Sequence, residues 1–288
     1  MLAPSWIPQA VRDATSHVEL WADSARFRRE RHPCVRALAR AMEATRTGAL
    51  TPAERRWVDE IERVRADALA NTESLEITDY GARTGADQLS AEEMRQGTII
   101  HRTIAEACRS SKPYIWSLLL FELVRAFKPA LCLEMGTCVG ISASYQAAAL
   151  TLNGGGRLIT LEGAPSLAGV ARRHFARLGL DNATVVVGRF SDTLETVLRE
   201  QGPAGLVFVD GHHDGDATLR YFEQIVPSLA TPAVIVFDDV AWSPGMKRAW
   251  RAISADARMQ VVVDLDLVGI CVANTDISGK RRYRLSLM

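Results

Sequence analysis

The sequence lacks several features that would assign a chain to a class at first sight. Its five cysteines include no C-x-x-C pair, and their odd number argues against a fully paired disulfide framework. We expect most of them to be small, buried apolar residues. The 34 basic residues are balanced by 34 acidic residues, so no overall charge attracts nucleic acid or an anionic membrane.

Long apolar runs are also missing. The longest, Tyr114 to Val124, is interrupted by Glu122 and is well short of the roughly 20 residues that a membrane span needs. The amino terminus shows no basic segment followed by an apolar one, as a secretory leader would. We therefore expect a soluble, cytoplasmic protein that acts on a small molecule, with no nucleic-acid or membrane partner, because its basic residues are dispersed.

Residues 1 to about 115 show helical patterns and no strand pattern. Thr51 and Ser90, each followed three residues later by glutamate, form capping boxes that mark two helix starts. Between them, Ile77 to Ala86 is rich in glycine and threonine, which predicts a loop. We expect this helical region to form a lid or the surface of a homodimer. Its candidate substrate-selecting residues are Trp6, Trp21, Trp57 and Tyr80.

Residues 116–288 alternate between strand and helix patterns, which is typical of a doubly wound, mostly parallel sheet. Five strand candidates are each followed by a helix pattern: Leu131 to Met135, Arg157 to Leu161, Thr184 to Val187, Leu206 to Val209 and Ala233 to Phe237. Two more runs, Val261 to Val272 and Tyr283 to Leu287, have no helix between them and should pair antiparallel. The fold class predicted is α/β, a Rossmann-like sheet of seven strands with an antiparallel last strand, preceded by the helical region.

A glycine-containing turn follows the first of these strands. An acid, a tight turn and a helix start come in order, at Glu134, Gly136, Thr137, Gly140 and Ser142. Glycine allows the backbone to approach a ligand closely, and the following helix offers free amide hydrogens. The pattern is not the G-x-G-x-x-G of dinucleotide-binding proteins, because Cys138 stands in place of the middle glycine. A purely structural turn between strand and helix is the alternative.

This E-x-G-T-x-x-G-x-S stretch resembles the first motif of the class I S-adenosylmethionine-dependent methyltransferases, most closely of their small-molecule O-methyltransferase branch. The resemblance implies that Glu134 lies near the methionine end of that cofactor. The sequence Asp-Tyr-Gly-Ala around Tyr80 also resembles a stretch of some bacterial methyltransferases of this class. The resemblance implies that Tyr80 folds over a cofactor or substrate. The alternative for Tyr80 is an ordinary surface loop.

Two further strand ends carry candidate cofactor residues. Glu162 ends the second strand candidate, where nucleotide-binding folds use one carboxylate to accept both ribose hydroxyls. The third strand is followed by Gly188, Phe190 and Ser191, in the region where the family places residues around the adenine. Phe190 is either a wall of the adenine site or simply part of the core.

Three aspartates follow the fourth and fifth strands. Asp210, Asp238 and Asp239 should meet at one edge of the sheet, and three uncompensated acids require either a protonated member or a bound cation. An all-oxygen set favours magnesium, manganese or calcium over zinc. The arrangement resembles the cation-dependent O-methyltransferases, although Asp239 stands where those enzymes usually carry asparagine. The alternative is helix capping, but Asp214 and Ser243 lie closer to the helices that follow.

His213 stands where the plant and animal enzymes of that branch carry lysine. The D-G-x-H arrangement resembles bacterial enzymes that methylate natural-product hydroxyls and in which the histidine is the general base. Imidazole titrates near neutral pH, so His213 could take a hydroxyl proton, with the carboxylates expected to raise its pKa. A hydrogen bond to metal or cofactor, or a surface position, remain open for His213, and His212 is expected to be structural or to lie at the rim of the site.

These observations predict an enzyme that moves the methyl group of S-adenosylmethionine to a hydroxyl of a small molecule. His213 and Asp210 are the catalytic candidates. Asp210 also counts among the cofactor residues and, with Asp238 and Asp239, among the ligands of a divalent cation, Mg or Mn. Two alternatives stay open: a metal-independent N- or O-methyltransferase, and a cofactor-binding protein without catalytic activity.

Overall fold

The computed structural model describes residues 20, 22–82 and 89–287. Trp6 and Trp21 lie outside these residues. So do the amino-terminal segment in which no leader was expected and the last part of the expected loop 77–86. No helix in the described part of the chain is long and apolar enough to cross a membrane.

In the described part of the chain, eight strands form one mixed sheet in the order β10-β8-β9-β7-β6-β3-β4-β5. Their bounds are β3 Leu131–Met135, β4 Arg157–Glu162, β5 Ala183–Val187, β6 Ala204–Val209, β7 Leu229–Phe237, β8 Met259–Asp264, β9 Gly269–Ala273 and β10 Arg281–Arg284. All neighbouring strands pair in parallel except that β9 runs antiparallel to both β7 and β8. The predicted Rossmann-like class and its five parallel strands are confirmed.

The carboxyl-terminal strands differ from the prediction. The run from 261 to 272 is two strands rather than one, because Leu265 donates a backbone hydrogen bond to Val268 and Asp266 adopts a left-handed conformation at φ 66°. These two strands, β8 and β9, form the antiparallel pair. The final run is β10, which pairs in parallel with β8 rather than antiparallel, and which makes the sheet one strand wider than expected.

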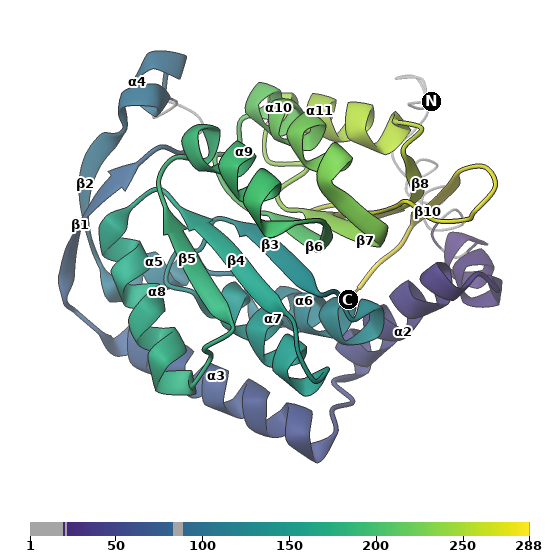
Figure 1. Ribbon diagram of the computed structural model, residues 1–288, viewed down its shortest axis with the longest axis horizontal. Helices are drawn as coiled ribbons and strands as arrows, with labels where there is room; N and C mark the ends of the chain where they lie inside the picture. Colours follow the sequence, from purple (N-terminus) through teal and green to yellow (C-terminus); the bar gives the residue numbers. More distant parts are fainter. Residues whose placement is uncertain (1–19, 21, 83–88, 288) are drawn as a thin grey trace, which may run out of the picture.

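Helices cover both faces of the sheet (Figure 1). On one face lie α6 Tyr114–Phe127, α7 Ile141–Leu152 and α8 Pro165–Leu178, and on the other lie α9 Phe190–Gln201, α10 Gly215–Ile225 and α11 Pro244–Ala255. Alternation along the strands supplies both cores: Cys132 and Phe208 face the first set of helices, and Leu133 and Val207 face the second. Because the strands that precede α7 to α11 run in parallel, their carboxyl ends lie along one edge of the sheet.

The amino-terminal region packs against the first face. Its helices include α2 Pro33–Thr47, α3 Pro52–Ala70, α4 Ala91–Gln96 and α5 Ile104–Arg109. The capping boxes expected at Thr51 and Ser90 are both present. Val35 and Ile61 share one apolar core with Leu120 of α6, so α2 and α3 are packed onto the sheet domain. The division near residue 115, and a lid or dimer role for the first part, stay predictions.

The expectation that this region has no strand is wrong. β1 Ser74–Asp79 and β2 Thr98–Thr103 form an antiparallel hairpin. The helix that begins after Ser90 ends at Gln96, because the φ of 77° at Gly97 is unsuited to a helix, and β2 follows directly. Leu75 and Ile77 of β1 are buried at alternate positions, a short pattern that was hidden by the glycines and threonines after it.

All five cysteines are free, and Cys108, Cys132 and Cys271 are buried, as expected.

Candidate functional site

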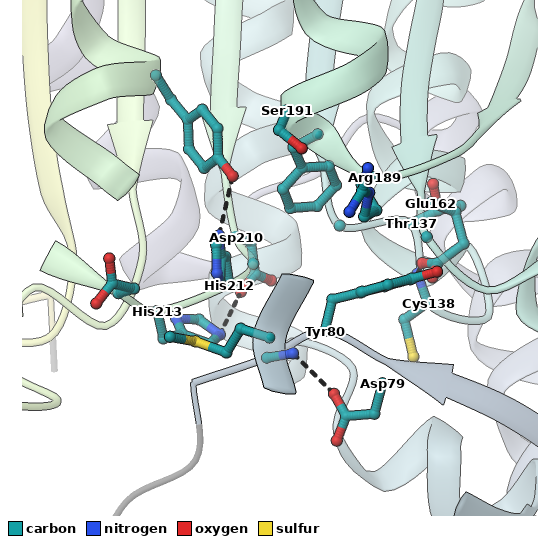
Figure 2. A pocket seen from close by; sticks show the side chains of 18 of the residues that line it. Asp79, Tyr80, Thr137, Cys138, Glu162, Arg189, Ser191, Asp210, His212 and His213 are labelled. Atoms are coloured by element: carbon teal, nitrogen blue, oxygen red, sulfur yellow. Dashed lines mark hydrogen bonds and ion pairs between the residues drawn. The ribbon is translucent and has the colours of Figure 1, made fainter. Parts of the chain in front are cut away.

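A cavity of about 850 Å³ opens at the carboxyl ends of β3, β4 and β6 (Figure 2). It has the size usual for small-molecule and cofactor sites, and it lies where open α/β sheets bind ligands. Most of the residues singled out in the sequence line it, namely Gly136, Thr137, Ser142, Glu162, Phe190, Ser191, Asp210 and His213. Glu134, Gly140, Gly188, Asp238 and Asp239 are not part of this lining.

Glu134 lies at the end of β3, behind the cavity wall. Its side chain is fully buried, and Ser142, which does line the cavity, donates a hydrogen bond to Oε1. Oε2 has no hydrogen-bond partner among the described residues. Burial raises the pKa of Glu134 to about 8, although the Ser142 hydroxyl favours the charged form. A buried carboxylate oxygen without a donor is costly, which is why the protonated form is favoured here.

Glu162 lies at the end of β4 in the cavity wall. Its Oε2 accepts a hydrogen bond from the Cys138 amide at 2.8 Å and its Oε1 accepts one from the Ala164 amide at 2.9 Å. Burial raises the pKa of this carboxyl to about 7, against the effect of these amides. Each carboxylate oxygen can accept a second hydrogen bond, so Glu162 keeps capacity for two hydroxyl donors.

The glycine turn serves the packing of the protein as well as the cavity. At Gly136, with φ 109°, a Cβ atom would lie 1.8 Å from the carbonyl oxygen of Asp210. At Gly140, with φ 84°, it would lie 2.9 Å from the side chains of Ala171 and Phe175 of α8. Gly140 thus allows α8 to approach the start of α7. Cys138 also has a left-handed φ, 51°, in place of the middle glycine.

Tyr80, just after β1, lines the cavity from the amino-terminal side (Figure 2). Its ring is so close to Gly163 and Gly97 that a Cβ atom on either glycine would lie 2.7 Å from it. The following residues are tied to the opposite wall, because the Ala82 amide donates to the carbonyl of His212 at 2.8 Å. The placement of Tyr80 favours a role in the site over an ordinary surface loop.

The wall opposite Glu162 is aromatic. Phe190 packs on Gly211, where a Cβ atom would meet its ring at 2.8 Å, and contacts Tyr221 edge to face at 6.0 Å between ring centroids. The Tyr221 hydroxyl is 2.9 Å from Nδ1 of His212, so the core holds this ring, which also lines the cavity. Phe190 is therefore both a wall of the cavity and a part of the core behind it.

The acids at the ends of β6 and β7 are compensated by a lysine that sequence reasoning missed. The Nζ atom of Lys112 donates to Oδ2 of Asp238 and lies 3.7 Å from Oδ1 of Asp210. The lysine side chain is only 12% exposed, and that of Asp238 only 3%. Burial lowers the pKa of Lys112, but the two carboxylates outweigh it and the net shift is upward. The premise of three uncompensated acids is therefore wrong.

The lysine was hard to find from the sequence. It stands alone in a short loop between α5 and α6, with no pattern around it. The sequence offers one signal, which is that lysine is rare in this chain. Only four of the 34 basic residues are lysines: Lys112, Lys128, Lys247 and Lys280.

His213 lies between two carboxylates. Its Nε2 is 3.8 Å from Oδ1 of Asp210, and its Nδ1 is 3.7 Å from Oδ2 of Asp239. His213 and Asp239 have left-handed φ values of 48° and 52°, a strain that tends to occur at functional sites. Burial lowers the pKa of His213 below its usual value, and the charge of Lys112 lowers it further. The neighbouring carboxylates raise this pKa but do not outweigh the two other effects. The expected upward shift is wrong.

The aspartate cluster does not fit a divalent cation in this structure. Among the residues described, no group of three or more histidine, cysteine, aspartate or glutamate side chains is arranged to hold a metal ion. The ammonium group of Lys112 lies between Asp210 and Asp238, two of the three ligands expected for the ion. Burial and the charge of Asp238 raise the pKa of Asp210, against the opposing charge of Lys112.

Comparison with known proteins agrees with the fold and the motif. Residues 133–240 match the sequence family described as "Methyltransferase domain". The catechol O-methyltransferase of Mycobacterium tuberculosis is 36% identical over 125 residues, which cover 43% of this chain and 54% of that protein. That of Niastella koreensis is 36% identical over 110 residues, 38% and 48% of the two chains. The chain spans about half the length of the curated relatives it matches.

Solved structures extend the similarity beyond the matched segment. A cofactor-bound protein from MTB has a TM-score of 0.52 and 26% identity, covering 58% of this chain and 84% of its own. The O-methyltransferase TomG from Streptomyces achromogenes, in complex with SAM, has a TM-score of 0.50 and 25% identity, covering 57% and 82%. The sheet domain thus has the fold of these proteins, and residues 133–240 resemble a methyltransferase domain in sequence, as the motif predicts.

Proposed function

We propose that this protein transfers the methyl group of S-adenosylmethionine to a hydroxyl group of a small molecule. The observation that supports this most directly is that Glu162 and His213 line the same cavity. A carboxylate suited to ribose hydroxyls and a candidate base are thereby placed around one bound molecule. The curated relatives and TomG carry the name O-methyltransferase, which favours a hydroxyl over an amine as the acceptor.

The residues present fit the cofactor. Glu162 would accept the two ribose hydroxyls with the capacity that the Cys138 and Ala164 amides leave. Glu134 lies behind the cavity wall and would act on the methionine end through Ser142, which lines the cavity and donates to it. Phe190 and Tyr80 supply apolar surface at the cavity wall. When bound, S-adenosylmethionine supplies a methyl group that is already activated on a positively charged sulfur.

The protein's own contribution to the reaction is to position the acceptor oxygen and to remove its proton. His213 carries out the second task. Its lowered pKa keeps the imidazole neutral near pH 7 and able to accept a proton. The charges of Asp239, 3.7 Å from Nδ1, and of Asp238 stabilise the imidazolium that forms. No divalent cation takes part in this account, because the aspartate cluster does not fit one.

The experiment measures binding and transfer separately. We expect calorimetry to show binding of S-adenosylmethionine, and Glu162→Gln to weaken it by roughly 1.5 to 3 kcal/mol, the scale of hydrogen bonds to a charged group. Glutamine keeps an acceptor for one of the two buried amides, which alanine would not. Glu195→Gln, on the exposed surface of α9, is the matched control and should bind like the wild type.

Transfer is followed with a deuterium-labelled methyl donor and a panel of catechols, phenols, alcohols and amines. We expect mass spectrometry to find the label on a hydroxyl oxygen. Label on nitrogen alone would overturn the choice of acceptor. Tight cofactor binding without transfer to any acceptor would instead favour a binding protein without catalytic activity.

A further inference from the structure

Lys112 is fixed in place by the elements behind it. Its carbonyl oxygen accepts hydrogen bonds from Nη1 of Arg65 at 2.8 Å and from the Ser117 hydroxyl at 3.2 Å. Arg65 is held in turn by Glu62, which also accepts a hydrogen bond from the Tyr145 hydroxyl at 2.8 Å. A network from α3, α6 and α7 therefore directs this one lysine toward the acids at the ends of β6 and β7.

The ammonium group and a divalent cation would compete for the same carboxylates. Asp238 is almost fully buried, and its Oδ2 already receives the hydrogen bond of Lys112. An ion bound to Asp238 and Asp210 would lie within a few ångströms of the ammonium group, and the two would repel each other strongly in a partly buried site. Occupation by lysine therefore excludes occupation by metal.

We propose that the ammonium group of Lys112 takes the place of a divalent cation, so that methyl transfer in this protein is independent of metal ions. An ammonium group has three N–H donors; Asp238 accepts a hydrogen bond from one, and Asp210 lies 3.7 Å from the nitrogen. Because Lys112 lines the cavity, a remaining donor is available to the acceptor oxygen. This proposal rests on the proposed function and assigns Lys112 the binding and polarisation of the acceptor.

The reaction then balances without a metal. A lone pair of the acceptor oxygen forms the bond to the methyl carbon, and the electrons of the carbon–sulfur bond return to sulfur. The sulfonium becomes a neutral thioether. The hydroxyl proton passes to His213, whose imidazole becomes imidazolium. Lys112 donates a hydrogen bond to the oxygen throughout and keeps its proton.

The nature of the cation also affects the choice of acceptor. A chelated metal favours acceptors with two adjacent oxygens, because both can bind it. One N–H donor needs one oxygen only. We therefore expect acceptors with a single hydroxyl to be used as well as catechols.

The test uses Mn²⁺ as the probe and the electron paramagnetic resonance signal of the free ion as the readout. We expect the wild-type protein to leave the signal of equimolar Mn²⁺ unchanged. Lys112→Met uncovers the carboxylates and should bind one ion per chain at least about tenfold more tightly than the wild type, a difference of about 1.4 kcal/mol. Lys247→Met, an exposed lysine on α11, is the control and should behave like the wild type. Adding Asp238→Asn to Lys112→Met should abolish the gain.

The outcomes separate this proposal from the proposed function. Tight Mn²⁺ binding by the wild type that Asp238→Asn abolishes would overturn the role of Lys112, whatever the activity. So would wild-type turnover that disappears on exhaustive chelation and returns with Mg²⁺. Turnover that resists chelation, falls in Lys112→Met and is partly kept in Lys112→Arg would support the proposal. If the wild type methylates nothing, the proposed function fails, and Mn²⁺ binding still decides whether the lysine excludes the ion.

Discussion

His213 illustrates how burial can reverse a conclusion drawn from charge alone. Two neighbouring carboxylates are expected to raise the pKa of a histidine, and Asp210 and Asp239 do lie within 4 Å of its ring. Loss of hydration acts in the opposite direction and is larger, and Lys112 adds a second opposing contribution. The neutral imidazole is therefore the favoured form, which is the form that a general base requires.

The pH dependence of turnover should reflect this shift. Because only neutral His213 accepts a proton, turnover should rise with pH through an apparent pKa below 6.5, the usual value for histidine, and stay high at neutral pH. His213→Ala should remove this acidic limb and lower turnover by about 10²- to 10⁴-fold, with cofactor affinity nearly unchanged. Profiles of kcat against pH for both proteins test this.

His101→Ala, an exposed histidine on β2, is the matched control and should keep the wild-type profile. Full turnover by His213→Ala would make the histidine a bystander. An acidic limb above the usual histidine value would instead indicate that the carboxylates dominate its environment.

Among the elements, the turn between β3 and α7 has a second task besides offering amides to a ligand. Gly136 lies against the backbone of Asp210, directly after the neighbouring strand β6, and its amide donates to the Leu161 carbonyl of β4 at 3.0 Å. The turn therefore joins three adjacent strands where the cavity begins. Gly136 is therefore required by the sheet as well as by a ligand site.

Gly136→Ala should destabilise the fold severely. Its Cβ atom would lie 1.8 Å from the Asp210 carbonyl oxygen, in addition to the strain of a positive φ. We expect a loss of roughly 2 to 6 kcal/mol in the free energy of unfolding, the sum of backbone strain and overpacking. Gly154→Ala is the control, because Gly154 has a φ of 89° but no atom within 4 Å of its would-be Cβ. Urea denaturation of the two variants measures the difference, and equal losses would mean that the contact with Asp210 is unimportant.

At the scale of the whole molecule, the cavity unites parts that are distant in the sequence. Tyr80 comes from the amino-terminal hairpin, Lys112 from the loop before α6, and Glu162 and His213 from the sheet. The hairpin is also tied across the cavity by the bond from Ala82 to His212. A ligand in the cavity should therefore stabilise the amino-terminal region and the sheet domain together.

Thermal unfolding with S-adenosylhomocysteine tests this coupling. At a ligand concentration of 100 times Kd, the native state gains about 2.7 kcal/mol, which should raise Tm by about 5 °C or more. Tyr80→Ala should show a smaller rise at the same concentration, since an aromatic contact contributes about 0.5 to 1.5 kcal/mol. Tyr114→Ala, at an exposed residue outside the cavity lining, should rise like the wild type. An unchanged rise for Tyr80→Ala would show that the hairpin does not contribute to binding.

The amino-acid sequence by itself determined the parallel core of the fold and the acids around the glycine turn. Strand, turn and helix follow one another locally there, and parallel strands place their carboxyl ends at one edge, so Glu162, Asp210 and His213 could be expected in one place. The hairpin β1–β2 and the split between β8 and β9 were missed because each strand is short and its pattern weak.

Only the tertiary structure decided the charge balance of the site. Lys112 and Asp238 are 126 residues apart, and no periodic pattern relates a lone lysine in a loop to an acid at a strand end. Tyr80 likewise reaches the cavity through packing against Gly97 and Gly163. The pKa of His213 depends on its burial and on that distant lysine. Burial and long-range contacts arise only when the chain is folded, because they depend on which surfaces meet.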